Sequence, residues 1–327
     1  MAAVTSPPDS SLNSPTPGPS PAGAGEGRAL LILGPTASGK SALALAAAEE
    51  LGGEIVNADS MQVYRDLRII TARPSAEEEA RAPHHLYGHV DAGERYSVGK
   101  WVQEAKRTIG EIQERGRTAI VIGGTGLYFK ALTEGLLVAP AAPEEARALE
   151  RRLETEGVAA LHAELGLRDA EAASRISVKD APRIIRALSV IEATGRTLKS
   201  FETSEALKDW VGVALTPERG ALYRTIDARF LAMLQTGALE EASALLAREL
   251  DAKLPAMKAH GVPALIAHLR GEIGLDGAAA IGQRDTRRYA KRQFTWIAHQ
   301  IPQWRKVCDA ELQSRLGLAL AALRGDG

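Results

Sequence analysis

Cysteine and long apolar stretches are both scarce in this sequence. Cys308 is the only cysteine among 327 residues, so the chain can form neither an internal disulfide nor a multi-cysteine metal site. No apolar stretch approaches the roughly 20 residues that a helix needs to cross a bilayer. We therefore expect a protein of the reducing cytoplasm that does not enter a membrane.

A charge excess of one sign is also missing. The 40 basic and 41 acidic side chains nearly cancel, so the total charge does not indicate a polyanionic partner. A surface for nucleic acid would have to be a local cluster of basic residues. The hydrophobic content of 45% is ample for a large buried core, in one domain or two.

The N-terminal stretch, residues 1–27, is rich in Pro, Ser, Gly and Ala. It lacks the basic start and apolar run of a secretory signal, and it lacks the pattern of an amphipathic transit peptide. Such a composition cannot bury enough apolar surface to fold. We expect a disordered tail without a catalytic role.

Short apolar runs alternate with helix-like segments after this tail. The runs at 29–33, 54–58 and 118–122 have the length and composition of strands buried in a parallel sheet. From about 143 to 207 the pattern is helical and charged, and strand character returns at 211–215. The sequence therefore predicts an α/β fold, in which a helical insertion interrupts a parallel-sheet core. The expected units are a tail at 1–27, a core with C-terminal helices at 28–137 and 208–305, an insertion at 138–207, and a C-terminal segment at 306–327.

A phosphate-binding loop, or P-loop, follows the first apolar run. Gly34-Pro35-Thr36-Ala37-Ser38-Gly39-Lys40-Ser41 matches Gly-x-x-x-x-Gly-Lys-Ser/Thr between a predicted strand and a predicted helix. The glycines let successive backbone N–H groups converge on phosphate oxygens at the positive end of the helix dipole. Lys40 would bridge the outer phosphates, and the Ser41 hydroxyl could ligate Mg²⁺. The site is suited to a polyphosphate.

The strand ends near this loop carry one acid. The run at 119–122 continues into Gly123-Gly124-Thr125 without the carboxylate that an ATP-hydrolysing motor uses to hold Mg²⁺. Asp59 follows the second run, at the carboxyl end of a strand, where open α/β sheets bind their ligands. Asp59 is a candidate catalytic residue, although an Asp before Ser60 is also typical of a helix N-cap or a turn.

Five motifs together resemble the tRNA dimethylallyltransferase family, over about residues 28–305. In chain order they are the P-loop, Asp59-Ser60-Met61-Gln62-Val63-Tyr64, Ala82-Pro83-His84-His85-Leu86, Gly123-Gly124-Thr125-Gly126-Leu127-Tyr128 and Arg287-Arg288-Tyr289-Ala290-Lys291-Arg292-Gln293-Phe294-Thr295-Trp296. The resemblance implies transfer of a dimethylallyl group from dimethylallyl diphosphate to N6 of the adenosine 3′ of the anticodon, with release of diphosphate. The tRNAs would be those that read codons starting with U. The P-loop would hold the prenyl donor, not ATP.

The resemblance also implies roles for individual residues. Asp59 would take the proton of the adenine amine as the N–C bond forms, and general-base help of this kind is worth about 10² to 10⁴ in rate. Lys40, the P-loop amides, Mg²⁺ on Ser41 and the Thr125 hydroxyl would stabilise the departing diphosphate.

Contacts with the tRNA anticodon stem-loop are expected in two places. The target adenosine must be flipped out of the loop; the Gln62 amide is suited to reading its edge, and Met61 would line the channel. Basic residues of the insertion and of the last helices would contact phosphates. The resemblance places contacts at Arg147 and at residues 182–186, and the complete expected set is Asp59, Ser60, Met61, Gln62, Thr125, Arg147, Pro182, Arg183, Ile184, Ile185, Arg186, Lys258, Arg288, Lys291 and Arg292. We expect the protein to act as a monomer.

One departure from the family pattern leaves two candidates for a diphosphate-binding arginine. The family usually has arginine where Thr225 stands, and here Arg224 comes one place early. One residue corresponds to about 100° around a helix. Arg224 is the expected ligand, and Arg229 is the alternative.

Two other functions fit parts of the pattern. A P-loop small-molecule kinase would use Asp59 to accept a hydroxyl proton and the insertion as a lid. A non-catalytic RNA-binding module would not need Asp59 at all. The missing strand-end acid and the basic stripe between Arg284 and Arg292 favour the transferase.

Overall fold

The computed structural model describes residues 28–325, so the tail expected at 1–27 lies outside the described residues. A six-stranded sheet in the order β3-β2-β4-β1-β5-β6 forms the centre, and its strands pair in parallel. The α/β prediction is confirmed. The strands are β1 (Ala29–Leu33), β2 (Glu54–Asn57), β3 (His84–His85), β4 (Ala119–Gly123), β5 (Trp210–Leu215) and β6 (Arg305–Val307).

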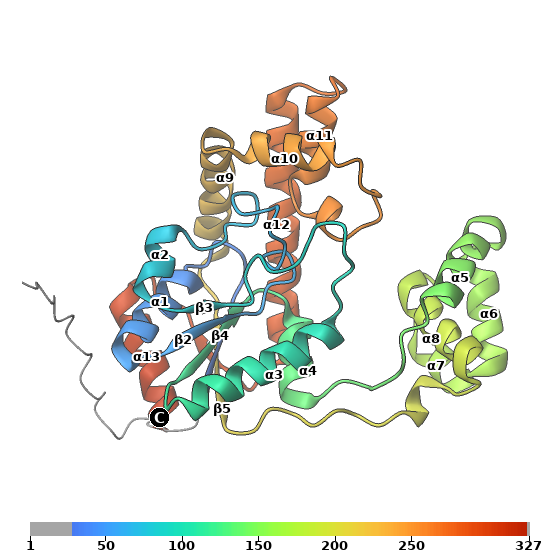
Figure 1. Cartoon of the computed structure of the whole chain (residues 1–327), viewed down its shortest axis with the longest axis horizontal. Helices are drawn as coiled ribbons and strands as arrows, with labels where there is room; N and C mark the ends of the chain where they lie inside the picture. The colour runs from blue at the N-terminus through green and yellow to red at the C-terminus, as the bar shows by residue number, and fades with distance from the viewer. Residues whose placement is uncertain (1–27, 326–327) are drawn as a thin grey trace, which may run out of the picture.

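Helices cover both faces of the sheet (Figure 1). α3 and α4 pack on one face, and α1 and α13 pack on the other. Because both faces are buried, the central strands are apolar throughout and do not alternate with polar residues. The helices of the core are α1 (Lys40–Leu51), α2 (Ala76–Arg81), α3 (Val98–Glu114), α4 (Gly126–Glu134), α9 (Arg219–Gln235), α10 (Ala238–Ala247), α11 (Val262–Leu269), α12 (Leu275–Gln300) and α13 (Leu312–Arg324).

A helical layer formed by α9 to α12 lies beyond the carboxyl ends of the strands (Figure 1). α12 is the longest helix at 26 residues, and it packs against both α9 and α11. Its C-terminal part reaches the sheet, where Ile297 joins the core beside α3 and α4. Site residues on α9 and α12 are therefore held against the edge of the sheet at which β1, β2 and β4 end.

The insertion is a separate bundle to one side of the core (Figure 1). Its helices are α5 (Pro143–Glu156), α6 (Val158–Arg168), α7 (Ala170–Arg175) and α8 (Ala181–Thr194). It has its own hydrophobic core. Two passes of chain connect it to the sheet, and they are bridged at Leu137 and Thr203. The Arg186 guanidinium donates to the carbonyls of Ala139 and Pro140 at 3.0 and 2.9 Å, which fixes α8 to one of these connections.

The chain after residue 305 is part of the core. β6 pairs with β5 at the edge of the sheet, and α13 buries Leu316, Leu320 and Leu323 on the face that also carries α1. The sequence patterns predict neither element. Among the described residues, no helix is long and apolar enough to span a membrane.

Candidate active site

The P-loop joins β1 to α1 at the carboxyl edge of the sheet. Ala37 and Gly39 have left-handed backbone torsions, with φ of 64° and 82°, and these curl the loop around the start of α1. Lys40 Nζ donates to the Pro35 carbonyl at 3.2 Å, so the side chain folds back over the loop. The loop thus has the strand–loop–helix setting that the motif requires.

Helix α13 supports the loop from behind. Arg315 Nη1 donates to the Ser38 carbonyl at 2.9 Å, and Arg315 Nε donates to the Asp309 carbonyl at 2.6 Å. A Cβ on Gly39 would lie 2.6 Å from Nη1, so a side chain there would displace the guanidinium. The Ser38 hydroxyl is buried and has no hydrogen-bond partner among the described residues. An unpaired buried polar atom is costly, and here it fits a loop built to receive a polar ligand.

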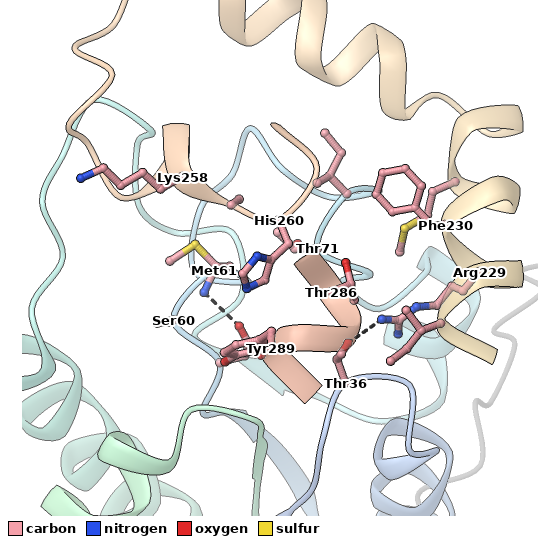
Figure 2. A pocket seen from close by; sticks show the side chains of 15 residues that line it. Thr36, Ser60, Met61, Thr71, Arg229, Phe230, Lys258, His260, Thr286 and Tyr289 are labelled. Carbon is pink, nitrogen blue, oxygen red and sulfur yellow. Dashed lines mark hydrogen bonds between the residues drawn. The ribbon is translucent and has the colours of Figure 1, made fainter. Parts of the chain in front are cut away.

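A cavity of about 170 Å³ opens above the P-loop. Its walls come from the segment after β2, from α9 and α12, and from the turn before α11 (Figure 2). Thr36 is the P-loop residue that lines the cavity, and Ser60 and Met61 line it as expected. We call this space the main cavity.

Asp59 lines the main cavity at the carboxyl end of β2. Its Oδ1 accepts from the Met61 amide at 3.0 Å, and its own amide donates to Asn57 Oδ1 at 2.8 Å. Trp101 Nε1 donates to the Asn57 carbonyl at 2.8 Å and so holds in place the residue that positions Asp59. Ser60 begins a turn, not a helix. The carboxylate is therefore held by a rigid turn while it faces the cavity.

Two half-buried cations lie close to Asp59. Burial lowers the pKa of Lys40 to about 8; the Asp59 charge opposes this shift and the Arg229 charge adds to it. Burial also lowers the pKa of Arg229, against the effect of Asp59. The Arg229 guanidinium donates to Thr36 Oγ1 on the P-loop. A doubly charged anion bound here would favour the protonated form of both cations.

Arg229, and not Arg224, supplies the arginine of this site. The two residues are five positions apart on α9, which separates their side chains by about 140° around the helix. Arg224 is exposed to solvent, whereas Arg229 lines the main cavity. The packing of α9 turns Arg224 away from the cavity, which favours the alternative, Arg229, as the arginine that binds the diphosphate.

Two expectations are contradicted by side-chain packing. Gln62 Nε2 donates to the carbonyls of Thr71 and Ala72 at 2.8 and 2.9 Å, so its donor is not available for bidentate reading of adenine. The Ile184 side chain is fully buried in the core of the insertion and is not available for contact with tRNA. Ile185 is 9% exposed but also lines a cavity between the insertion and the core, so its contact with tRNA stays a prediction.

Thr125 lies beside the main cavity and does not line it. Its Oγ1 accepts from the Ser60 amide at 3.0 Å, which ties the start of α4 to the segment after β2. Tyr289 lines both the main cavity and another one of similar volume, about 180 Å³, that includes Thr125. The pKa of Tyr289 is raised by burial and by the charge of Asp59. Tyr289 therefore borders both the cavity that contains Asp59 and the one that contains Thr125.

Two residues of the site were not singled out from the sequence. Gln293 Oε1 accepts from the Thr36 amide at 2.9 Å, and Gln293 Nε2 donates to the Gly124 carbonyl at 2.8 Å. This side chain joins the P-loop to the loop after β4. His260 lies with its ring centroid 4.7 Å from that of Tyr289, and burial lowers its pKa. Gln293 belongs to the Arg-Gln-x-Thr-Trp motif, so the sequence could have identified it as a site residue. His260 belongs to none of the motifs, so the sequence could not have identified it.

A second cavity separates the insertion from the core. Its lining comes from α5 and α8 on one side and from loop residues of the core on the other. Lys253 Nζ lies 3.4 Å from Glu154 across it. Pro182 and Arg186 line it as well, and Lys258 lines both this groove and the main cavity. The groove and the main cavity therefore meet at Lys258.

The other expected tRNA contacts are exposed. Arg147 lies on α5, and Arg183 lies at the start of α8, with its side chain 73% exposed and 3.4 Å from Asp180. Three further expected contacts lie on the solvent side of α12: Arg288, Lys291 and Arg292. Their neighbour Arg287 pairs with Asp227 of α9 and so joins α12 to α9.

In residues 28–325, no group of three His, Cys, Asp or Glu side chains is placed to hold a metal ion. The Ser41 hydroxyl lies in the exposed first turn of α1. A cation at Ser41 would need oxygens of a bound diphosphate to complete its ligands, which is a common way for Mg²⁺ to bind.

Comparisons with known proteins agree on one family. Residues 62–300 match the family model for IPP transferase, and residues 27–87 match the model for isopentenyl transferase. The tRNA dimethylallyltransferase of Rhodopseudomonas palustris is 57% identical over 89% of this chain and 93% of the relative. That of a Bradyrhizobium species is 59% identical over 85% of this chain and 93% of the relative.

Solved structures are similar as well. The full-length tRNA isopentenylpyrophosphate transferase of Bacillus halodurans is 34% identical, with a TM-score of 0.67 over 91% of this chain and 96% of the other. A eukaryotic dimethylallyltransferase acting on tRNA is 26% identical, with a TM-score of 0.77 over 91% of this chain and 79% of the other. These relatives do not favour the small-molecule kinase.

Proposed function

This chain belongs to the IPP transferase family, and the relatives named above are tRNA dimethylallyltransferases. We propose that it transfers a dimethylallyl group from dimethylallyl diphosphate to N6 of the adenosine 3′ of the anticodon. The substrates are tRNAs that read codons starting with U, and diphosphate is released. One observation carries the proposal: Asp59 and Arg229 line a single cavity above a P-loop, with Lys40 close to both.

The diphosphate of the donor binds on the P-loop in this proposal. The loop amides, Lys40 and Arg229 neutralise its charge, and the Thr36 hydroxyl is positioned by Arg229. Ser41 would hold Mg²⁺ together with diphosphate oxygens, and the bound ion would stabilise negative charge on the leaving group.

Asp59 serves as the general base. As the bond between N6 and C1 of the donor forms, the bond between C1 and the diphosphate oxygen breaks. The N6 proton passes to the Asp59 carboxylate, and the bonding electron pair leaves with the diphosphate. The turn from Asn57 to Met61 holds the carboxylate in place, while Lys40 and Arg229 stabilise the charge that develops on the leaving oxygen.

The anticodon stem-loop reaches the site from the groove between the insertion and the core. A nucleotide flipped out of the stem-loop passes Lys258 on its way to Asp59, because the groove and the main cavity meet there. Exposed arginines such as Arg147 and Arg183 contact phosphates of the stem-loop. The enzyme acts as a monomer in the cytoplasm.

Transfer of labelled dimethylallyl from its diphosphate to an unmodified anticodon stem-loop tests the proposal. Asp59→Asn is expected to lower kcat by about 10² to 10⁴, and Lys40→Ala by about 10² to 10³. Asp276→Asn, at an exposed position at the start of α12, is the matched control and should retain full activity. Unlabelled RNA with the wild-type enzyme, together with ATP-dependent phosphorylation of a small molecule, would overturn the proposal.

A further inference from the structure

The main cavity has a polar part and an apolar part. Ser60, which follows Asp59 directly, and Tyr289 lie on the side toward Lys258, where the cavity meets the groove (Figure 2). Phe230 lies on the opposite side, above Arg229 (Figure 2). The apolar side chains that line the cavity near it are Ile226 and Met233, each within about one turn of Phe230 on α9, and Ile70, which lies with Phe230 beside Gly261.

This division matches the chemistry of an allylic diphosphate, on the basis of the function proposed above. The ionic head of such a donor belongs beside Arg229 and the P-loop, and its C1 must lie within reach of a base held near Asp59. The hydrocarbon tail then needs an apolar surface that is next to Arg229 and away from the groove through which the RNA arrives. The part of the cavity around Phe230 satisfies both conditions.

The Phe230 ring is fixed against backbone on two sides. A Cβ built on Gly282 of α12 would lie 2.1 Å from Phe230 Cζ, and one on Gly261 would lie 2.9 Å from Cε2. The ring therefore occupies space that any side chain at these positions would need. With only 6% of Phe230 exposed, the ring has no room to move back and forms a rigid wall.

We propose that Phe230 sets the length of prenyl group that the enzyme transfers. The ring closes the apolar end of the cavity, so that a five-carbon tail fits in front of it. A ten-carbon allylic diphosphate with the same head would need the space that the ring fills. Met233, one turn further along α9 and partly buried, extends the same wall.

The experiment compares two donors, dimethylallyl diphosphate and geranyl diphosphate, with the full chain and an unmodified tRNA. The quantity measured is the ratio of kcat/KM for geranyl to kcat/KM for dimethylallyl. Phe230→Ala is expected to raise this ratio at least about tenfold, because a hydrophobic pocket discriminates by the carbons that it can hold. Met233→Ala is expected to raise it less, and serves if Phe230→Ala folds poorly. The KM for tRNA should be unchanged in both.

Leu222→Ala is the matched control. Leu222 lies on the same helix and is 3% exposed, but it does not line the cavity, so the substitution loosens α9 without opening the wall. An unchanged ratio in both Phe230→Ala and Met233→Ala, or an equal rise in Leu222→Ala, would overturn the role of Phe230 and leave the proposed function intact. A wild-type enzyme that transfers no dimethylallyl to tRNA would overturn both.

Discussion

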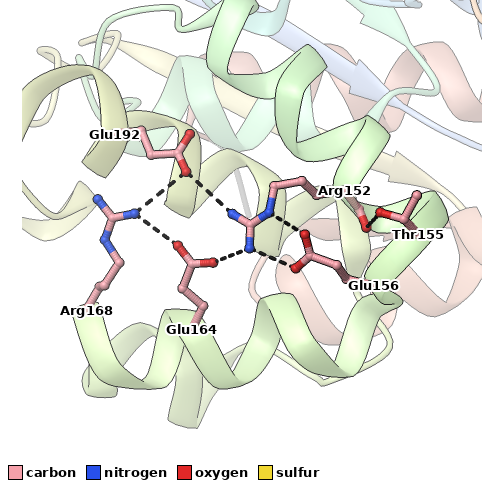
Figure 3. A network of polar contacts seen from close by, with 6 residues as sticks. All are labelled: Arg152, Thr155, Glu156, Glu164, Arg168 and Glu192. Atoms are coloured by element: carbon pink, nitrogen blue, oxygen red, sulfur yellow. Dashed lines mark hydrogen bonds and ion pairs between the residues drawn. The ribbon is translucent and has the colours of Figure 1, made fainter.

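In the core, the two cations next to Asp59 are half-buried, whereas in the insertion many charged groups lie near the surface and pair with one another. Lys40 and Arg229 share one nearby carboxylate, Asp59. Arg152 of the insertion contacts three glutamates, and Arg168 contacts two of the same set (Figure 3). Lys40 and Arg229 therefore lack the compensation that Arg152 and Arg168 already have.

This difference separates two tasks. Cations that are desolvated and under-compensated gain most from a bound anion, so residues of the core should control the chemical step and donor binding. Exposed cations gain mainly from the salt-dependent attraction of phosphates, so residues of the insertion should control affinity for tRNA. The glutamate-paired arginines of the insertion should control neither.

The largest effect on catalysis is expected at Arg229, and it tests the assignment of donor binding to the core. Arg229→Ala should lower kcat/KM for the donor by about 10² to 10³, because it removes a donor aimed at the leaving group. Arg224→Ala, five residues away on the same helix and exposed, should stay within about twofold of wild type. Steady-state kinetics with both variants check this, and equal losses would restore Arg224 as the ligand.

A smaller effect is expected from pH. Lys40, with its pKa lowered to about 8, is protonated below that pH and loses its charge above it. Affinity for the donor should therefore fall as pH rises, approaching about tenfold per unit well above pH 8. Donor binding measured between about pH 7 and 9.5 checks the sign. Lys40→Arg should bind the donor independently of pH over this range, since arginine stays charged; an identical decline would assign it to another group.

A few-fold effect is expected in the insertion. Arg183→Ala should raise the KM for tRNA about threefold to tenfold and leave the KM for the donor unchanged. Loss of one phosphate contact should also reduce the slope of log affinity against log salt by about 0.7 to 0.9. Arg175→Ala, exposed and paired with Glu171 on α7, is the control. A change in the donor KM alone would contradict the separation of tasks.

The smallest effect is expected in the ion network of the insertion. Arg152→Met should leave kcat and both KM values within about twofold of wild type, because exposed ion pairs contribute little. A slightly lower Tm is the only expected consequence. If the KM for tRNA instead rose as much as with Arg183→Ala, the network would have to position the insertion on the RNA.

Features with local signals could be predicted from the sequence. The strand, P-loop and helix at 29–51 are specified by neighbouring residues, and so are the apolar runs of β2, β4 and β5. β3 and β6 have two and three residues, which is too short for a periodic pattern. They are strands because β2 and β5 offer them partners.

The orientation of individual side chains could not be predicted in the same way. Arg224 and Arg229 both lie on α9, and only the packing of α9 against α12 decides which of them faces the cavity. Gln62 was expected to read a base because of its amide, but the carbonyls of Thr71 and Ala72 approach it from another part of the chain. In each case the decisive contact is tertiary.

Helix α13 gives the order of synthesis a consequence for this enzyme. The P-loop precedes Arg315, which supports its Ser38 carbonyl, by 277 residues in the chain. During synthesis, the phosphate site therefore stays without this support until α13 has also been made and has packed. A chain that stops before α13 lacks both this contact and the cover that α13 provides over the sheet. The donor site is complete only when α13 is in place.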